Sequence, residues 1–115
     1  MPRTTAFSRG DVVLVEFVFS DELGTKLRPA VIVSSSAYIK SRQEIVIAAL
    51  TSNVARHLLG DHIVADWRGA GLLFPSVVTG IIRTVKRSMI RRKLGSLAQP
   101  DLDAVSGALR RSLGL

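Results

Sequence analysis

Two apolar, strand-like runs of this chain carry polar side chains at one end. The first, residues 27–34 (LRPAVIVS), places Arg28 directly before the proline that opens a β-branched run. The second, residues 44–53 (EIVIAALTSN), ends in three consecutive hydrogen-bonding side chains, of which Thr51 is the first. If the two segments pair as antiparallel neighbours, the start of one lies beside the end of the other. A guanidinium beside a hydroxyl cluster is then a candidate phosphate site, because its planar fork can hold two oxygens at once.

The chain carries a strong positive charge for its size. Sixteen Lys and Arg against nine Asp and Glu give a net charge of +7 over 115 residues. The basic residues gather between residues 83 and 93, and a smaller group consists of Lys26, Arg28, Lys40 and Arg42. This charge favours a polyanionic partner, with nucleic acid as the first candidate. A merely solvated basic surface and an acidic protein partner are the alternatives.

The sequence lacks the residues that several kinds of catalytic site require. The absence of cysteine excludes disulfides, thiolate metal sites and cysteine nucleophiles. His57 and His62 have no carboxylate cluster at ligand spacing, so no metal site is predicted. No GxxxxGKS/T, GxGxxG or GxSxG pattern occurs, which leaves nucleotide cofactors and an esterase-type serine without support. An enzyme built from this chain is expected to work without a metal or a cofactor.

These exclusions favour RNA over DNA as the substrate of any phosphodiester cleavage. The RNA 2′-hydroxyl lies beside its own phosphorus, so its attack is intramolecular and benefits from a high effective concentration. The protein then supplies a cation and hydrogen-bond donors for the charge on the phosphoryl oxygens, a role that suits Arg28 and Thr51. The expected products are a 2′,3′-cyclic phosphate and a 5′-hydroxyl. In the alternative interpretation, Arg28 pairs with Glu16 or Glu44 and Thr51 only caps a strand end.

The elements that must position these residues are short strands followed by one helix. Apolar runs predict strands over residues 12–19, 28–34, 44–50, 62–66 and 76–85, with a short sixth strand over 88–91. Gly80 predicts a bulge or a close backbone approach within the fifth strand. Residues 100–113 predict a helix with an apolar face that packs on the core, formed by Leu102, Val105, Leu109 and Leu113. The connection over 35–42 has room for one helical turn, and Trp67 is predicted to pack rather than to stack on bases.

This order of elements predicts a mainly β (α+β) fold, a strongly bent sheet or partial barrel covered on one side by the helix. We expect residues 1–115 to form a single domain. No apolar run approaches the roughly 18 residues of a membrane span. Residues 1–10 also lack the apolar core of a signal peptide. A soluble cytoplasmic protein with no membrane partner is therefore expected.

Five short motifs occur in the order and approximate spacing of the MazF/PemK-like toxins. They are Gly10–Val13, Arg28–Ser34, Ala49–Asn53, Pro75–Val78 and Ile82–Thr84. The chain resembles this family from about Arg9 to the terminal helix. The resemblance implies a homodimeric, SH3-like barrel of five to six strands with a C-terminal helix. It also implies a sequence-specific endoribonuclease (mRNA interferase) of a type II toxin–antitoxin system, which cuts single-stranded RNA and is silenced by a cognate antitoxin protein.

The family's site residues carry over onto matching positions of this chain. Arg28 matches the catalytic arginine of the family's Arg-Pro motif, and Thr51 matches its catalytic Thr/Ser. Arg83 matches a recurrent arginine, which we assign to RNA binding. Ser52 and Asn53 either bind RNA or only form the turn that follows the strand.

The loop before Leu27 departs from the family pattern. Many members have a Gly-Ser-Glu-containing loop there, whereas this chain has SDELGTK over residues 20–26. Because this loop helps to shape the RNA groove, Glu22 and Lys26 are candidate RNA contacts. The general base is open among Asp21, Glu22 and His57. Two other functions stay as alternatives: a non-catalytic basic barrel that binds nucleic acid, and a CcdB-like toxin that poisons DNA gyrase.

Overall fold

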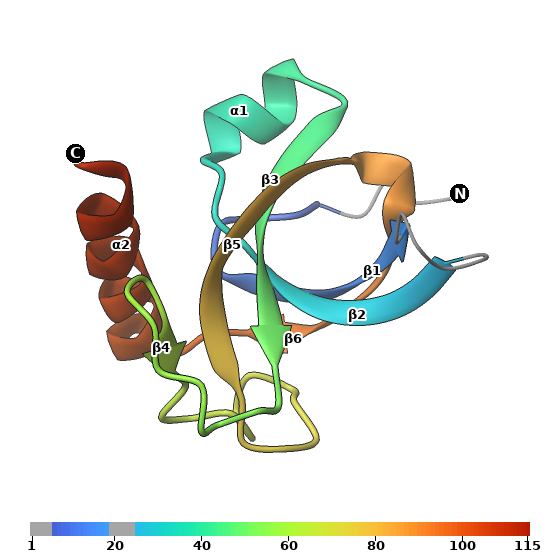
Figure 1. Cartoon of the computed structure of the whole chain (residues 1–115). Coiled ribbons are helices and arrows are strands. Elements are labelled where there is room, and N and C mark those ends of the chain that lie inside the picture. The colour runs from blue at the N-terminus through green and yellow to red at the C-terminus, as the bar shows by residue number, and fades with distance from the viewer. Residues whose placement is uncertain (1–5, 19–24) are drawn as a thin grey trace.

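The computed structural model describes residues 6–18 and 25–115 as a strongly curved antiparallel sheet with two helices (Figure 1). The strands are β1 (Asp11–Val18), β2 (Thr25–Ile32), β3 (Glu44–Thr51), β4 (His62–Ile63), β5 (Val77–Lys86) and β6 (Ile90–Ser96). The helices are α1 (Ser36–Ser41) and α2 (Gln99–Leu113), and a short 3-10 helix, η1, spans Arg87–Met89. The predicted mainly β fold with a terminal helix is confirmed, as is the helical turn after β2.

The sheet forms a barrel that is not fully closed. Its strand order is β4-β5-β3-β2-β1-β6, so β4 and β6 are the edges. The connection after β4 touches the β6 edge: a Cβ on Gly71 would lie 2.1 Å from the Leu94 carbonyl oxygen, and one on Gly95 would lie 2.4 Å from that of Ala70. Gly71 also has a φ of +82°, which disfavours any side chain. These two glycines let the two backbones approach where the barrel would otherwise stay open.

Both faces of the central strands are buried, because they pack against two separate apolar clusters. The cluster beneath α2 contains Val12, Val31, Ala48 and Val105. The cluster beside α1 contains Val13, Ala30, Ile47 and Ile39. Neighbouring residues fall into different clusters because successive side chains of a strand point to opposite faces. This explains why the strands have nearly continuous apolar sequences rather than an alternating pattern.

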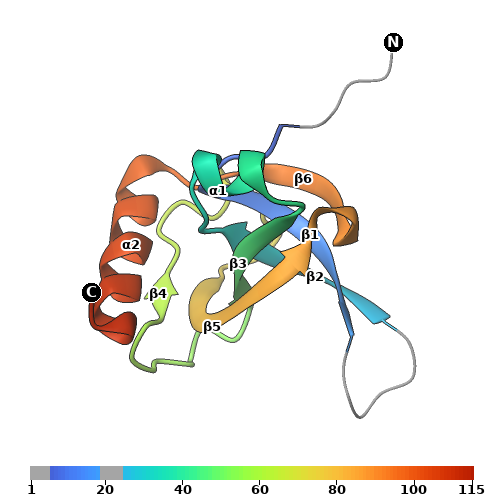
Figure 2. The same ribbon diagram turned by 90° about the horizontal axis from the view of Figure 1, so that it is seen from above.

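Helix α2 lies beside β4 and covers one side of the sheet (Figure 2). Val105 is buried, and Leu102 and Leu109 pack partly buried against the same cluster, as the apolar stripe predicts. Leu113 does not follow this prediction and is 57% exposed. It lies in the last turn, directly before Gly114 ends the helix in a left-handed conformation, at the outer edge of the molecule.

The predicted bounds of three strands are wrong. The second strand begins at Thr25 and ends at Ile32, rather than spanning residues 28–34. The sixth strand begins at Ile90 rather than at residue 88 and continues to Ser96, through a basic segment whose apolar content is low. Pairing with β1 determines it, since Val13 lies opposite Lys93 and Leu14 opposite Arg92. The fourth strand ends at Ile63 rather than at residue 66: the Val64 N–H still binds the Ser76 carbonyl, but the Ala65 and Asp66 N–H groups bind a carboxylate instead of a neighbouring strand.

That carboxylate belongs to Asp101, which fastens α2 to the segment after β4. Its side chain is 3% exposed and accepts hydrogen bonds from His62 Nε2 at 2.8 Å, Ala65 N–H at 2.9 Å and Asp66 N–H at 3.0 Å. Burial raises the pKa of Asp101, but the two backbone donors and the His62 ring outweigh burial and hold this pKa below its ordinary value of 3.8. The ionised carboxylate is therefore the form that stabilises the fold.

We expect Asp101→Asn to lower the free energy of unfolding by about 1–3 kcal/mol at neutral pH, because the amide satisfies the three donors less well. The difference from wild type is present above pH 3.8 and is lost as the pH falls through the lowered pKa of Asp101. Urea unfolding at a series of pH values measures both effects. Asp103→Asn, an exposed position of the same helix, is the matched control and should change stability by about 0.5 kcal/mol or less.

Candidate active site

The register of β2 and β3 brings Arg28 and Thr51 together. Ala30 pairs with Ala49, and the same antiparallel register, continued by two residues, places Arg28 opposite Thr51. The two side chains line the same two hollows, one on each side of them. The predicted antiparallel pairing of the two strands is confirmed, and Arg28 and Thr51 do lie close together, although Arg28 is in the middle of β2 rather than at its start. Their catalytic roles stay predictions.

The first hollow, called here the basic hollow, has a volume of ≈ 310 Å³. Its lining includes three arginines, Arg28, Arg56 and Arg83, together with Thr51 and Asn53. Arg83 belongs to β5, where it lies opposite Ile47 and so projects from the same face of the sheet as Thr51. Three guanidinium groups around one hollow create a strongly positive potential that suits an anion.

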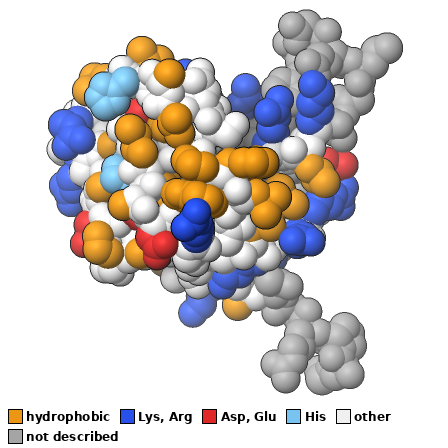
Figure 3. All heavy atoms as spheres, turned by 90° about the horizontal axis from the view of Figure 1, so that it is seen from below, with side chains coloured by type: hydrophobic (Ala, Val, Ile, Leu, Met, Phe, Trp, Pro, Cys, Tyr) orange, Lys and Arg blue, Asp and Glu red, His pale blue; other side chains and the backbone are white. Residues whose placement is uncertain are grey.

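The second hollow, called here the apolar hollow, lies on the other side of Arg28 and Thr51. It has a volume of ≈ 460 Å³, and Arg92 lines it in addition to Arg28. Its apolar lining includes Leu14, Pro29, Leu50, Leu72, Leu73, Phe74 and Leu94. Leu73 and Phe74 are 83% and 63% exposed, which is unusual for large apolar side chains. On the face seen in Figure 3, hydrophobic side chains gather beside Lys and Arg. Such an arrangement suits a ligand with a flat apolar part and an anionic part.

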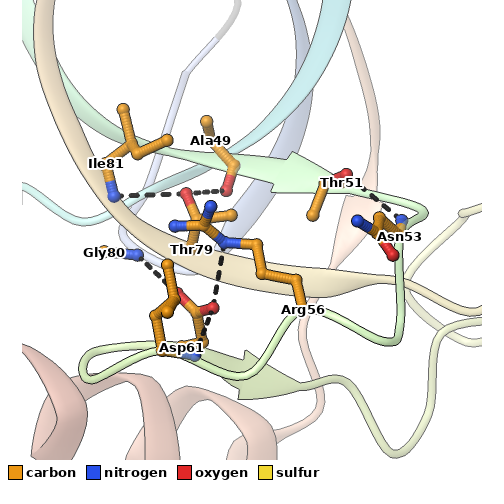
Figure 4. A network of polar contacts seen from close by, with 9 residues as sticks. Ala49, Thr51, Asn53, Arg56, Asp61, Thr79, Gly80 and Ile81 are labelled. Atoms are coloured by element: carbon orange, nitrogen blue, oxygen red, sulfur yellow. Dashed lines mark hydrogen bonds and ion pairs between the residues drawn. The ribbon is translucent and has the colours of Figure 1, made fainter.

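Thr51 caps the end of β3 and still offers a hydrogen-bond donor. Its Oγ1 accepts a hydrogen bond from the Asn53 N–H at 3.2 Å (Figure 4). This bond is the strand-end cap that the alternative interpretation expected. It uses only an acceptor lone pair of the hydroxyl, so the O–H proton is not consumed by it. Capping fixes the oxygen in place and is compatible with donation to a phosphate oxygen.

Ser52 and Asn53 form the turn after β3 and also border the site. The Asn53 carbonyl accepts a hydrogen bond from Arg56 N–H at 3.2 Å, which closes the turn. Asn53 lines the basic hollow, and Ser52 lines the apolar hollow. Forming the turn and contacting RNA are therefore compatible roles for Ser52 and Asn53.

A bulge in β5 shapes the floor of the basic hollow. Ala48 pairs with Ile82 but Leu50 pairs with Val78, so β5 has extra residues around Gly80. The Thr79 hydroxyl bridges the interrupted ladder: it donates to the Ala49 carbonyl at 2.8 Å and accepts from Ile81 N–H at 3.2 Å (Figure 4). The bulge predicted at Gly80 is confirmed.

Arg56 is a site residue that sequence reasoning missed. It follows β3 in an irregular loop and belongs to none of the motifs quoted above. Its Nε lies 2.9 Å from Asp61 Oδ2, and the Asp61 side chain is only 1% exposed. The sequence does contain a signal that could have identified Arg56. Arg56 and Asp61 are opposite charges in the short loop directly after Thr51.

Asp61 is held in its ionised form by several donors. Its carboxylate also accepts hydrogen bonds from Leu58 N–H at 3.1 Å and Gly80 N–H at 3.2 Å. Burial raises the pKa of Asp61, but these backbone donors and the Arg56 guanidinium outweigh it and lower the pKa below its ordinary value. One buried carboxylate thus ties the loop after β3 to the bulge of β5.

The remaining predicted site residues are less closely connected to the two hollows. Lys26 is exposed on β2 and lines neither of them, and the exposed His57 also lines neither. Asp21 and Glu22 lie outside the described residues. Trp67 packs against the cluster beneath α2, as predicted. The two carboxylates considered as partners of Arg28 each form an ion pair with another arginine, Glu16 with Arg91 and Glu44 with Arg42.

Within the described part of the chain, no group of three or more His, Asp or Glu side chains is arranged to hold a metal ion. No helix among residues 6–18 and 25–115 is both long and apolar enough to span a membrane.

The structure is thus a small partial β barrel in which an arginine and a threonine together line a basic and an apolar hollow. Residues 8–113 match the model of the PemK-like, MazF-like toxin of type II toxin-antitoxin systems. Endoribonuclease MazF of Staphylococcus epidermidis is 30% identical over 110 residues, which are 93% of this chain and 91% of that protein.

Solved structures share the fold. A mycobacterial endoribonuclease in complex with its cognate antitoxin is 24% identical, with a TM-score of 0.77 over 96% of this chain and 97% of that one. A MazE–MazF structure from Deinococcus radiodurans is 20% identical, with a TM-score of 0.80 over 97% and 99% of the two chains. The chain belongs to the PemK/MazF-like toxin family of type II toxin–antitoxin systems, as its motifs predicted. A non-catalytic binding barrel and a CcdB-like gyrase poison are not favoured by these matches.

We expect Asp61→Ala to lower the free energy of unfolding by about 1–3 kcal/mol, because it leaves the Leu58 and Gly80 N–H groups and the Arg56 guanidinium without their acceptor. Hydrogen exchange of the Leu58 and Gly80 amides should accelerate more than that of the core strands. Asp66→Ala, which removes an exposed carboxylate bonded to Gly69 N–H, is the control and should leave both amides unchanged. Unchanged exchange in Asp61→Ala would contradict the role of Asp61.

Proposed function

We propose that this protein is an endoribonuclease toxin that cleaves single-stranded RNA, mRNA above all, at short preferred sequences. The 2′-hydroxyl attacks the adjacent phosphorus and the 5′-oxygen leaves, which gives a 2′,3′-cyclic phosphate and a 5′-hydroxyl. The observation that carries the proposal is that Arg28 and Thr51 together line both the basic and the apolar hollow. The activity for which the staphylococcal relative is named supports it.

Arg28 and Thr51 act on the charge of the transition state. The Arg28 guanidinium holds two phosphoryl oxygens through its planar fork, and the Thr51 hydroxyl donates to one of them. Both groups are positioned before RNA binds: Arg28 by the β2–β3 register and Thr51 by the Asn53 N–H. Preorganised donors of this kind stabilise developing charge without reorganisation during the reaction.

Each of the two hollows binds a different part of the RNA. Since Arg28 and Thr51 line both, the scissile phosphate lies at their boundary. The RNA backbone continues into the basic hollow, where Arg83 contributes charge, and an unstacked base enters the apolar hollow beside Leu73 and Phe74. Single-stranded RNA fits this division, because its bases can turn out of the stack.

The group that accepts the 2′-hydroxyl proton comes from outside the described lining. No carboxylate among the described residues lines either hollow. His57 is exposed and lines neither, so Asp21 and Glu22 are the better candidates of the three. Glu22 and Lys26 remain proposed RNA contacts of the loop that joins β1 and β2.

The proposal extends to the assembly. The mycobacterial endoribonuclease with the same fold was solved with its cognate antitoxin. We propose that residues 1–115 act as one domain within a homodimer, that a cognate antitoxin silences it, and that it works in the cytoplasm, where mRNA is available.

We expect Arg28→Ala and Arg28→Lys to reduce RNA cleavage by at least 10²-fold, because lysine keeps the charge but not the fork. Thr51→Val, which keeps shape but loses the donor, should reduce it by about 10²-fold, and Thr51→Ser should retain most activity. The measurement is the rate of single-stranded RNA cleavage in EDTA. The two Arg28 variants and Thr51→Ser should unfold as wild type does, whereas Thr51→Val also loses the acceptor of the Asn53 N–H and should be less stable by about 0.5–1.5 kcal/mol.

Lys40→Ala, on the exposed side of α1 and outside both hollows, is the control and should cleave at the wild-type rate. Wild-type activity of Arg28→Ala would refute the mechanism. Bound but uncut RNA would favour the non-catalytic alternative.

A further inference from the structure

An ion pair with Asp61 fixes Arg56 in the basic hollow, and the proposed mechanism does not use this ion pair. Its side chain is 27% exposed, yet its Nε lies 2.9 Å from a carboxylate that is 1% exposed. Figure 4 shows the Arg56 guanidinium between Asp61 and the Thr79 region of β5. An irregular loop would ordinarily leave a long side chain free among many rotamers. Here the buried carboxylate selects one position.

The support of Arg56 reaches the sheet itself. Asp61 is tied to the β5 bulge by the Gly80 N–H at 3.2 Å and to its own loop by the Leu58 N–H at 3.1 Å. The loop backbone passes close by, since a Cβ on Gly80 would lie 3.4 Å from the Leu59 carbonyl oxygen. Asp61 therefore fixes the position of the Arg56 guanidinium relative to β5, the strand that carries Arg83.

The ion pair leaves ligand-binding capacity on Arg56. A guanidinium has five N–H donors, and the Asp61 carboxylate lies beside Nε as an ion-pair partner without hydrogen-bond geometry. The two terminal nitrogens carry the other four donors, and Arg56 lines the basic hollow. The carboxylate behind them also offsets part of the repulsion among Arg28, Arg56 and Arg83. A purely structural ion pair would not need to lie at a hollow with two further arginines.

We propose that Arg56 binds the RNA phosphate next to the scissile one, and that Asp61 is the positioning residue that aims it. The inference rests on the proposed function for the place of the scissile phosphate. A phosphate suits the site better than a base does, because the rigid fork presents charged donors and the hollow is bordered by cations. Arg56 thereby fixes the direction in which the RNA leaves the Arg28–Thr51 pair.

Salt-dependent binding tests the phosphate contact without requiring cleavage. The probe is a short, labelled 2′-O-methyl RNA of random sequence, which lacks the attacking hydroxyl. The slope of log affinity against log salt reports the number of phosphates neutralised, at about 0.7 per phosphate for single strands. Arg56→Gln should reduce this slope by about 0.7 and weaken binding roughly tenfold at moderate salt. Arg68→Gln is the matched control, because Arg68 lies over the Trp67 ring and lines neither hollow.

Equal slopes for wild type and Arg56→Gln, or no binding of the probe by wild type, would overturn the inference. A lower unfolding midpoint of Arg56→Gln with an unchanged slope would show that the ion pair is only structural. A slope that falls equally in Arg68→Gln would show a general effect of surface charge and would also overturn it. The proposed function fails by a separate result, namely uncut natural RNA with wild-type protein.

The positioning role of Asp61 has its own readout. Asp61→Asn keeps the Arg56 charge, so the salt slope should stay near that of wild type while KM for natural RNA rises several-fold. Adding Arg56→Gln to Asp61→Asn should raise KM no further than Arg56→Gln alone, because the two residues act as one unit. Additive effects on KM would contradict the positioning role.

Discussion

The pairing register of β2 with β3 is the constraint on which the site depends. Ala30 opposite Ala49 brings Arg28 beside Thr51, and a shift of one residue would turn one of these two side chains to the opposite face of the sheet. The register is held from both sides, since Val31 and Ala48 pack in one cluster while Ala30 and Ile47 pack in the other. Burial on two faces thus specifies the position of two polar side chains, Arg28 within β2 and Thr51 at the end of β3.

Around Arg28 and Thr51, a bulge and a loop position groups that regular strands could not place there. The β5 bulge at Gly80 interrupts the ladder, and the Thr79 hydroxyl satisfies the backbone groups that the bulge leaves without partners. The Gly80 N–H then binds Asp61, which in turn holds Arg56. A single bulge therefore links the shape of the hollow, the conformation of the loop after β3 and the placement of a cation. Bulges beside functional sites commonly re-aim side chains in this way.

Sequence reasoning predicted the elements with strong local signals. The apolar runs of β1, β2, β3 and β5, the proximity of Arg28 and Thr51, and the bulge at Gly80 all follow from periodicity and residue type. What it missed depends on long-range contacts. The basic segment of β6 becomes a strand only because β1 pairs with it, and β4 is short because Asp101, on α2, binds the Ala65 and Asp66 N–H groups. Arg56 escaped notice because its role depends on a buried partner that no local pattern identifies.

The central claim is that the scissile phosphate lies between Arg28 and Thr51. A crystal structure of the protein with an RNA that carries a 2′-deoxy substitution at the mapped cleavage site tests this directly, because the attacking hydroxyl alone is removed. The account predicts that the phosphate that follows this sugar accepts hydrogen bonds from the Arg28 guanidinium and the Thr51 hydroxyl. A phosphate bound elsewhere, with Arg28 and Thr51 not in contact with RNA, would contradict it.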